Sequence, residues 1–392
     1  RLLLSMGQVN LERDSHVIDL SERRVYFRPP QETTRRERGR YLDSPSPLTQ
    51  KQSLEGTTKL AYRLWFAVIW GWTAWFVARY AYSLYDDAYI YLRYVDNVLA
   101  GCGLRFNCAD VPVEGFTSPL YLAITVLGGA LGADLEIFVQ LFGLLALASA
   151  TSVVFGVIVQ RGLEVTSPAH ALVIGMGTTA VLLASPNFLL NSVIGLETAL
   201  ACLVLTLLLW SASRPHMPFL RTLLVLAFVT RPESALFTLA LPLTQKGRDL
   251  RYLMPLGLAL GAIQLVRILS FGEFFPNTFY AKSGGTMNHL LLGLEYIGMI
   301  VYDFPYVLLG IGALLSRPLR KKTRWVWVAI SVWLLFFLKS GGDAFEYSRL
   351  AVPLVPGILM LGVTGLLPRL MNISSPRTQL AVVVCITLGF VG

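Results

Sequence analysis

The sequence predicts an all-α protein that crosses a membrane many times. Hydrophobic residues make up 54% of its 392 residues and charged residues only 15%, and the mean hydropathy is +0.58. Apolar runs recur from about Leu60 to the last residue, and a helix needs about 20 such residues to cross a bilayer. We therefore expect a bundle of about ten or eleven transmembrane helices.

The net charge of +9 does not indicate a nucleic-acid-binding protein. The basic residues lie in short clusters between apolar runs, as they do in loops that obey the positive-inside rule. The lipid bilayer is therefore the expected partner, and nucleic acid is not. The clusters after the first apolar run are Arg161 and residues 214–221, 246–251, 317–324 and 369–377.

Residues 1–58 differ from the apolar remainder. They are rich in arginine, interrupted by Pro29, Pro30, Pro45 and Pro47, and have no apolar stretch that could form a core. We expect a disordered cytoplasmic extension that either only fixes topology or binds a partner or lipid surface, followed by a membrane domain over residues 59–392. No signal-peptide pattern precedes residue 60. The first residue is not Met and the last run is apolar, so we expect cuts at both ends, with the domain truncated at its C-terminal end.

The basic clusters also predict the orientation of the chain. With the extension in the cytoplasm, a first span over residues 60–84 delivers Asp86 and Asp87 to the far side. After Arg161, basic loops alternate with acidic or mixed segments, so we expect those segments to converge on one outward-facing cavity. They are residues 195–197, 230–233, 275–282 and 341–349.

Two regions do not fit full crossings. Residues 119–132 and 136–160 look like two spans, but two crossings would invert every later loop, so we interpret the first as short, tilted or re-entrant. The apolar runs beside residues 230–233 are about ten to thirteen residues long, which is too short for a span. The turn between them should therefore lie below the membrane surface, with Arg231 and Glu233 at the floor of a pocket.

Asp86 and Asp87 begin a predicted helix, with Ser83 as a candidate N-cap. A helix N-terminus favours ionised carboxylates, whereas their proximity opposes two negative charges. One ionised carboxylate is a candidate general base. The other carboxylate could hold Arg93, a substrate hydroxyl or a divalent cation. Arg93 is expected on the same helical face as Asp86.

Three cations are placed by this topology on the same outward side. Lys282, Arg231 and Arg349 could stabilise the charge on a departing phosphate. Purely structural roles stay open for several of the charged residues. Arg231 with Glu233 could be a paired charge inside the bundle, and Glu197 could cap a helix.

The cysteines add one local expectation. Cys102 and Cys108 lie in the same outward loop, beside Gly101 and Gly103. In an oxidising compartment they could form a disulfide, or they could stay free.

Several segments carry a resemblance to a known family. Residues 86–94, 99–107 and 113–120, the last with Glu114, resemble the first outward loop of the GT-C glycosyltransferases. They are most similar to the branch that contains the mycobacterial terminal arabinofuranosyltransferases and related bacterial membrane proteins. Later segments resemble the same branch in the same order: Gly195-Leu196-Glu197, Arg231-Pro232-Glu233, residues 276–282, and Gly341-Gly342-Asp343 followed by Arg349.

This resemblance implies a GT-C-like bundle with a long first periplasmic loop that carries short helices, in the bacterial inner membrane. Such an enzyme moves a sugar from a polyprenyl-phosphate carrier to a glycan or lipid acceptor of the cell envelope, on the periplasmic side, with Asp86 or Asp87 as the base. Cys102 departs from the family pattern, which commonly has histidine there. The implied substrate-binding residues are Arg93, Glu114, Glu197, Arg231, Glu233, Asn277, Tyr280, Lys282, Asp343 and Arg349.

Two other classes of function stay open. A non-catalytic membrane scaffold for envelope assembly or motility would keep its role when the tandem aspartates are replaced. A secondary transporter would tend to show paired interrupted helices in two halves of the chain, and the sequence has no such repeat.

Overall fold

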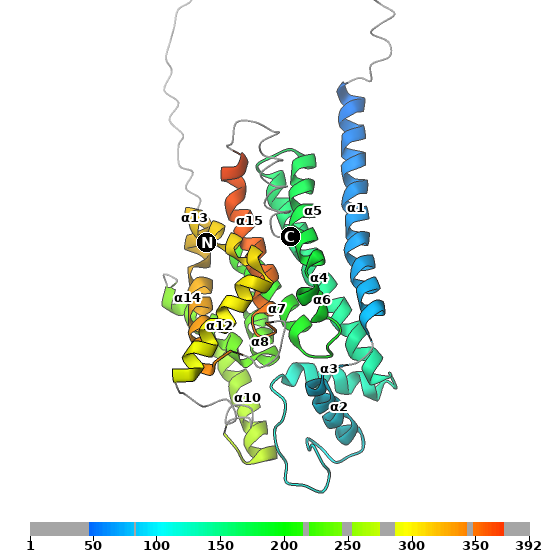
Figure 1. Ribbon diagram of the computed structural model, residues 1–392, viewed down its shortest axis with the longest axis vertical. Helices are drawn as coiled ribbons and strands as arrows, with labels where there is room; N and C mark the ends of the chain where they lie inside the picture. Colours follow the sequence, from blue (N-terminus) through cyan, green and yellow to red (C-terminus); the bar gives the residue numbers. More distant parts are fainter. Residues whose placement is uncertain are drawn as a thin grey trace, which may run out of the picture. The chain divides into compact units, whose positions relative to one another are not determined.

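The computed structural model describes residues 47–81, 84–214, 219–244, 253–274, 287–342 and 348–371. The chain divides into two compact units, Arg1–Leu54 and Glu55–Gly392, and the predicted extension lies mostly outside the described residues. The described part of the second unit is all helical, as expected (Figure 1). The described elements of the chain are α1 (Pro47–Tyr80), α2 (Asp86–Leu99), α3 (Pro119–Ala130), α4 (Leu135–Leu163), α5 (Pro168–Ala184), α6 (Pro186–Leu190), α7 (Thr198–Ser213), α8 (Leu220–Thr230), η1 (Pro232–Ser234), α9 (Ala235–Thr244), α10 (Leu253–Phe271), α12 (Met287–Asp303), η3 (Pro305–Gly310), α13 (Ile311–Leu315), α14 (Arg317–Ser340), η4 (Val352–Leu354) and α15 (Val355–Met371).

Several of these helices are long and apolar enough to span a membrane. Among the described residues four segments reach this length and composition: α4, α10, α14 and Val352–Arg369. A fifth is reached if α12 and the η3–α13 segment, which meet at a 90° bend, form one broken span. Fewer helices than the predicted ten or eleven qualify, because several apolar runs fold as shorter helices, such as α5 and α7. The 34-residue α1 is also not among them.

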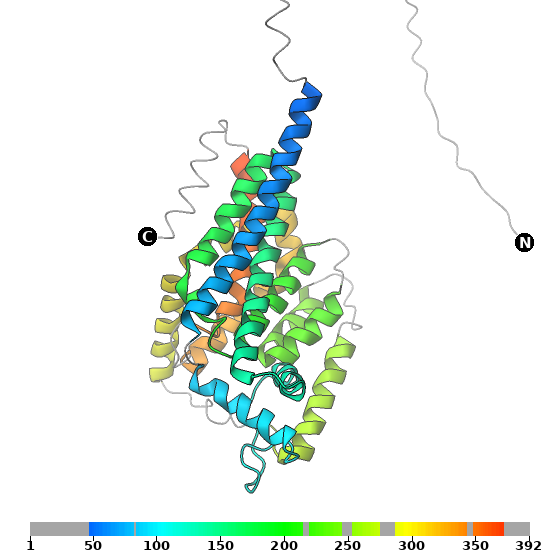
Figure 2. The ribbon, with the colours of Figure 1, turned by 90° about the vertical axis from the view of Figure 1, so that its right-hand side faces the viewer.

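Helix α1 packs along α4 and α5 through aromatic side chains. Trp65 Nε1 donates to Thr179 Oγ1 of α5 at 2.8 Å, and Trp70 Nε1 donates to Ser152 Oγ of α4 at 3.1 Å. Tyr62 stacks on Phe155 with ring centroids 4.9 Å apart. Such an acceptor stabilises a buried indole N–H, because a buried donor without a partner costs free energy. These bonds fix α1 against the bundle (Figure 2).

The two ends of the bundle differ in charge. At one end, which we call the basic end, Arg214 Nη2 donates to Gln160 Oε1 near the end of α4 at 2.8 Å. At the same end Arg369 Nη2 of α15 donates to the Leu315 carbonyl, just before the basic start of α14, at 3.1 Å. Helices α2 and α3 and the connection between them lie at the opposite end, which we call the loop end (Figures 1 and 2).

The short helices predicted in both irregular regions are confirmed. Helix α3 has 12 residues and lies across the loop end instead of crossing the bundle (Figures 1 and 2). Ser118 caps it by accepting from the Tyr121 amide, and Pro119 occupies its first turn. Helices α8 and α9 have 11 and 10 residues, and η1 joins them just after Arg231. Arg231 is buried within the bundle, and the depth of this turn in a membrane stays a prediction.

Candidate functional site

Ion pairs connect distant segments around the loop end. Among the described residues three such pairs join segments far apart in the sequence, and we call their six residues the ion-pair cluster. The pairs are Asp87 with Arg349, Glu114 with Arg267, and Glu197 with Arg231. All but Arg267 were predicted as site residues from the sequence.

The tandem aspartates have different surroundings. Helix α2 begins at Asp86, and Asp86 Oδ1 accepts from the Asp87 amide at 2.9 Å. Asp87 Oδ2 lies 3.0 Å from Arg349 Nη1, with side-chain exposures of 33% and 12%. Asp86 is exposed. A substrate can therefore reach the carboxylate of Asp86 without displacing an ion-pair partner. The predicted cap, Ser83, lies outside the described residues.

Arg349 is positioned by a polar network that the sequence did not reveal. Its neighbour Ser348 is fully buried and donates Oγ to Asp303 Oδ2 at 2.8 Å. Asn187 Nδ2 donates to the other oxygen of Asp303 at 3.0 Å. Ser348 has a φ of 49°, which a residue other than glycine adopts only where the surroundings require it. Asp303 thus fixes the backbone from which Arg349 reaches Asp87.

The segment before α7 docks on the start of α2. The Tyr85 amide donates to the Ile194 carbonyl at 3.2 Å, and Tyr121 Oη donates to the Gly195 carbonyl at 2.7 Å. Gly195 has a φ of +76°, and a Cβ there would lie 2.8 Å from Leu84 Cδ2. Only glycine fits this conformation and this contact.

This docking brings Glu197 close to α2. Burial, and next the negative charge of Glu197, raise the pKa of Tyr91 well above its ordinary value. Glu197 Oε1 lies 3.0 Å from Arg231 Nη2, and both side chains are more than 90% buried. Glu197 stands at the N-cap of α7 but makes no capping bond. Arg231 pairs with Glu197, while Glu233 Oε2 is buried and has no hydrogen-bond partner among the described residues.

A second buried pair fastens α10 to the connection between α2 and α3. Arg267 binds Glu114 with two bonds, Nε to Oε2 at 2.5 Å and Nη2 to Oε1 at 3.1 Å. Phe271 packs edge-on against Phe116, with ring centroids 6.2 Å apart. Arg267 was not among the site residues predicted from the sequence. A single arginine inside the apolar run of α10 is nevertheless a signal, because a charge in an apolar segment is costly.

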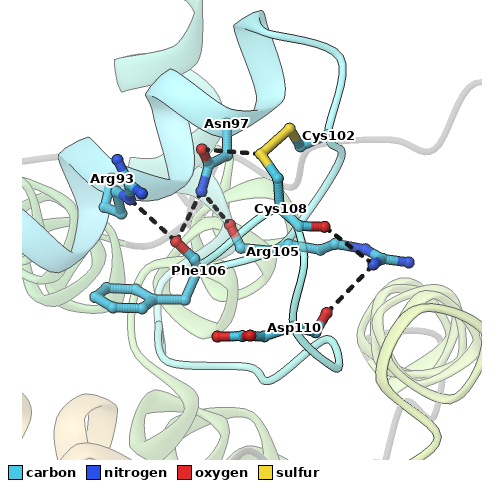
Figure 3. Close-up of a disulfide and its surroundings, with 7 residues drawn as sticks. All are labelled: Arg93, Asn97, Cys102, Arg105, Phe106, Cys108 and Asp110. Atoms are coloured by element: carbon cyan, nitrogen blue, oxygen red, sulfur yellow. Dashed lines mark hydrogen bonds between the residues drawn. A yellow bond between two sulfur atoms is a disulfide. The ribbon is translucent and has the colours of Figure 1, made fainter.

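The connection after α2 is closed by a disulfide between Cys102 and Cys108 (Figure 3). The buried amide of Asn97 supports it by donating to the Phe106 carbonyl at 2.8 Å. Arg93 Nε donates to the same carbonyl at 3.1 Å. Arg93 therefore binds this loop, as Figure 3 shows. The cation that pairs with Asp87 is Arg349 instead.

Some predicted site residues cannot be placed. Asn277, Tyr280, Lys282 and Asp343 lie outside the described residues. Within the described ranges, no group of three or more His, Cys, Asp or Glu side chains could hold a metal ion.

No family model matches the chain, and neither a curated protein nor a solved structure is significantly similar to it. The fold and the site define an all-helical protein whose helices include several that can span a membrane, with charged segments gathered at the loop end. The resemblance to the GT-C glycosyltransferases rests on the sequence motifs alone.

Proposed function

We propose that the protein is a membrane glycosyltransferase with a GT-C-like bundle and a site at the loop end. The observation that carries the proposal is the ion pair between Asp87 and Arg349, which joins two of the family-like segments across 262 residues of sequence. Exposed Asp86 lies directly beside it. A candidate base and a candidate phosphate-binding cation are thus held together.

The reaction follows from these two groups. Asp86 accepts the proton of an acceptor hydroxyl, and the acceptor oxygen forms a bond to the anomeric carbon of the sugar. The bond from that carbon to the carrier phosphate breaks, and polyprenyl phosphate leaves as an anion. Arg349, with five N–H donors, binds the leaving phosphate while Asp87 keeps the guanidinium in place.

The other two pairs of the ion-pair cluster serve as positioning residues in this proposal. Glu197 and Arg231 are too buried to bind a sugar without unfolding their surroundings, and they fix the segment under α2. Glu114 and Arg267 hold α10 against the loop end. The proposal keeps Lys282 as a second phosphate-binding cation, and Asn277, Tyr280, Asp343, Glu233 and Arg93 as residues lining the substrate path.

The proposal places the loop end on the periplasmic side of a bacterial inner membrane, with about ten or eleven spans in the complete bundle. Its support is that basic residues gather at the opposite end, as the positive-inside rule requires of a cytoplasmic face.

The test is mass spectrometry of envelope glycans from cells that lack the gene and carry it again in different forms. We expect wild type to restore a missing sugar residue and Asp86→Asn to fail at unchanged protein level. Asp96→Asn is the matched control, because Asp96 is an exposed acid on the same helix and should restore the sugar. Full restoration by Asp86→Asn would favour the non-catalytic scaffold instead.

A further inference from the structure

A cavity lies between α1, α4 and α7 near the basic end, away from the ion-pair cluster. Its volume is about 500 Å³, which falls within the range of about 300–1,000 Å³ typical of ligand sites. Its walls are mostly apolar side chains, among them Val153 and Val157 of α4 and Leu207 of α7. Tyr62 of α1 closes one side. We call this space the α1–α4–α7 groove.

The groove owes its depth to a missing side chain. Gly156 lines it, and a Cβ there would meet only Tyr62 Oη, at 3.4 Å. Glycine is a poor helix former in the middle of a 29-residue helix. Space for a larger side chain is therefore present but left unfilled.

The lip of the groove carries polar groups that suit an anion. Arg214 lines it, donates Nη2 to Gln160 Oε1 at 2.8 Å and lies 4.5 Å from the Trp210 ring centroid. The guanidinium has five donors in a fork that matches phosphate.

We propose that the α1–α4–α7 groove binds one anionic phospholipid of the leaflet at the basic end. The acyl chain lies along the apolar walls, and the phosphate binds Arg214 at the lip of the groove. Basic pockets between membrane helices on the cytoplasmic side are suited to anionic headgroups. A soluble anion would gain nothing from the apolar walls, so a lipid fits the lining better than free phosphate does.

The test is native mass spectrometry of the purified protein in detergent, titrated separately with phosphatidylglycerol and phosphatidylcholine of the same chains. We expect wild type to retain phosphatidylglycerol at least tenfold more strongly. Gly156→Leu fills the groove and should lower the retention of both lipids about tenfold. Arg214→Gln should abolish the preference between them.

Two matched controls keep the result specific. Gly71→Leu adds the same side chain at a helical glycine with open space around it, and Arg161→Gln removes a basic residue paired with Glu164 at the same end. Both should bind lipid as wild type does. Unchanged retention in Gly156→Leu, or a preference that survives Arg214→Gln, would overturn the proposal, as would equal binding of the two lipids by wild type. The measured quantity is lipid retention and not sugar transfer, and no residue of the ion-pair cluster lines the groove. This proposal and the proposed glycosyltransferase activity can therefore fail independently.

Discussion

At the scale of residues, the two adjacent aspartates differ because only one of them meets a cation. Asp87 pairs with Arg349, whereas Asp86 at the first position of α2 stays exposed. The sequence identified the tandem carboxylates as site candidates but could not separate them, because the partner arrives from 262 residues away. It missed Asp303 for the same reason, since its bonds to Asn187 and Ser348 depend on packing between distant helices.

The Asp87–Arg349 pair should show strong coupling in a double-mutant cycle. We expect Asp87→Asn and Arg349→Gln each to lower sugar transfer about 10²-fold, with the double variant close to either single one. The measurement is initial transfer rate in membranes at matched protein amounts. Losses that multiply in the double variant would mean that the two residues act independently.

The Glu114–Arg267 pair should matter for stability. Because Arg267→Met leaves a buried carboxylate without its partner, we expect a loss of about 3 to 5 kcal/mol in unfolding free energy. Adding Glu114→Gln should recover much of that loss. Thermal unfolding of the purified variants in detergent measures both, and a double variant no more stable than Arg267→Met would contradict the pair's assigned role.

At the scale of elements, apolar run length predicted the short helices well. Helix α3 and the α8–η1–α9 break match the expected interruptions, because too few apolar residues stand between turn signals for a crossing. The number of spans was harder to predict, since length alone does not show which runs cross a membrane. The docking of the 191–197 segment on α2 was not predictable, because it depends on a backbone conformation at Gly195.

Gly195→Ala tests this docking. A Cβ there meets Leu84 Cδ2 at 2.8 Å and Ala88 Cβ at 3.1 Å, so the segment that carries Glu197 must move away from α2. We expect transfer to fall at least tenfold. Gly103→Ala is the matched control, because Gly103 has a similar φ of +73° but no heavy atom within 4 Å of the added Cβ. Equal activity in the two variants would show that backbone strain alone, and not the contact with α2, sets the effect.

At the scale of the whole molecule, the separation of the basic end from the loop end predicts a defined sidedness. Helix α4 is long and apolar enough for one crossing, so we expect the residues just before it and just after it to lie on opposite sides. Alkaline phosphatase fused after residue 133 should be active, and a fluorescent protein fused after residue 165 should be bright and its phosphatase counterpart inactive. Alkaline phosphatase activity at both fusion points, or at neither, would contradict this orientation.

The most direct test of the central claim is transfer of a labelled sugar from a polyprenyl-phosphate donor by purified protein in liposomes. The assay supplies radiolabelled polyprenyl-phosphate pentose or hexose together with envelope extract as acceptor. We predict that wild type and Asp96→Asn transfer label to the acceptor from one of these donors, and that Asp86→Asn loses at least 99% of the rate, about a 10²-fold effect. Equal transfer by Asp86→Asn and wild type would contradict the assignment of Asp86 as the base.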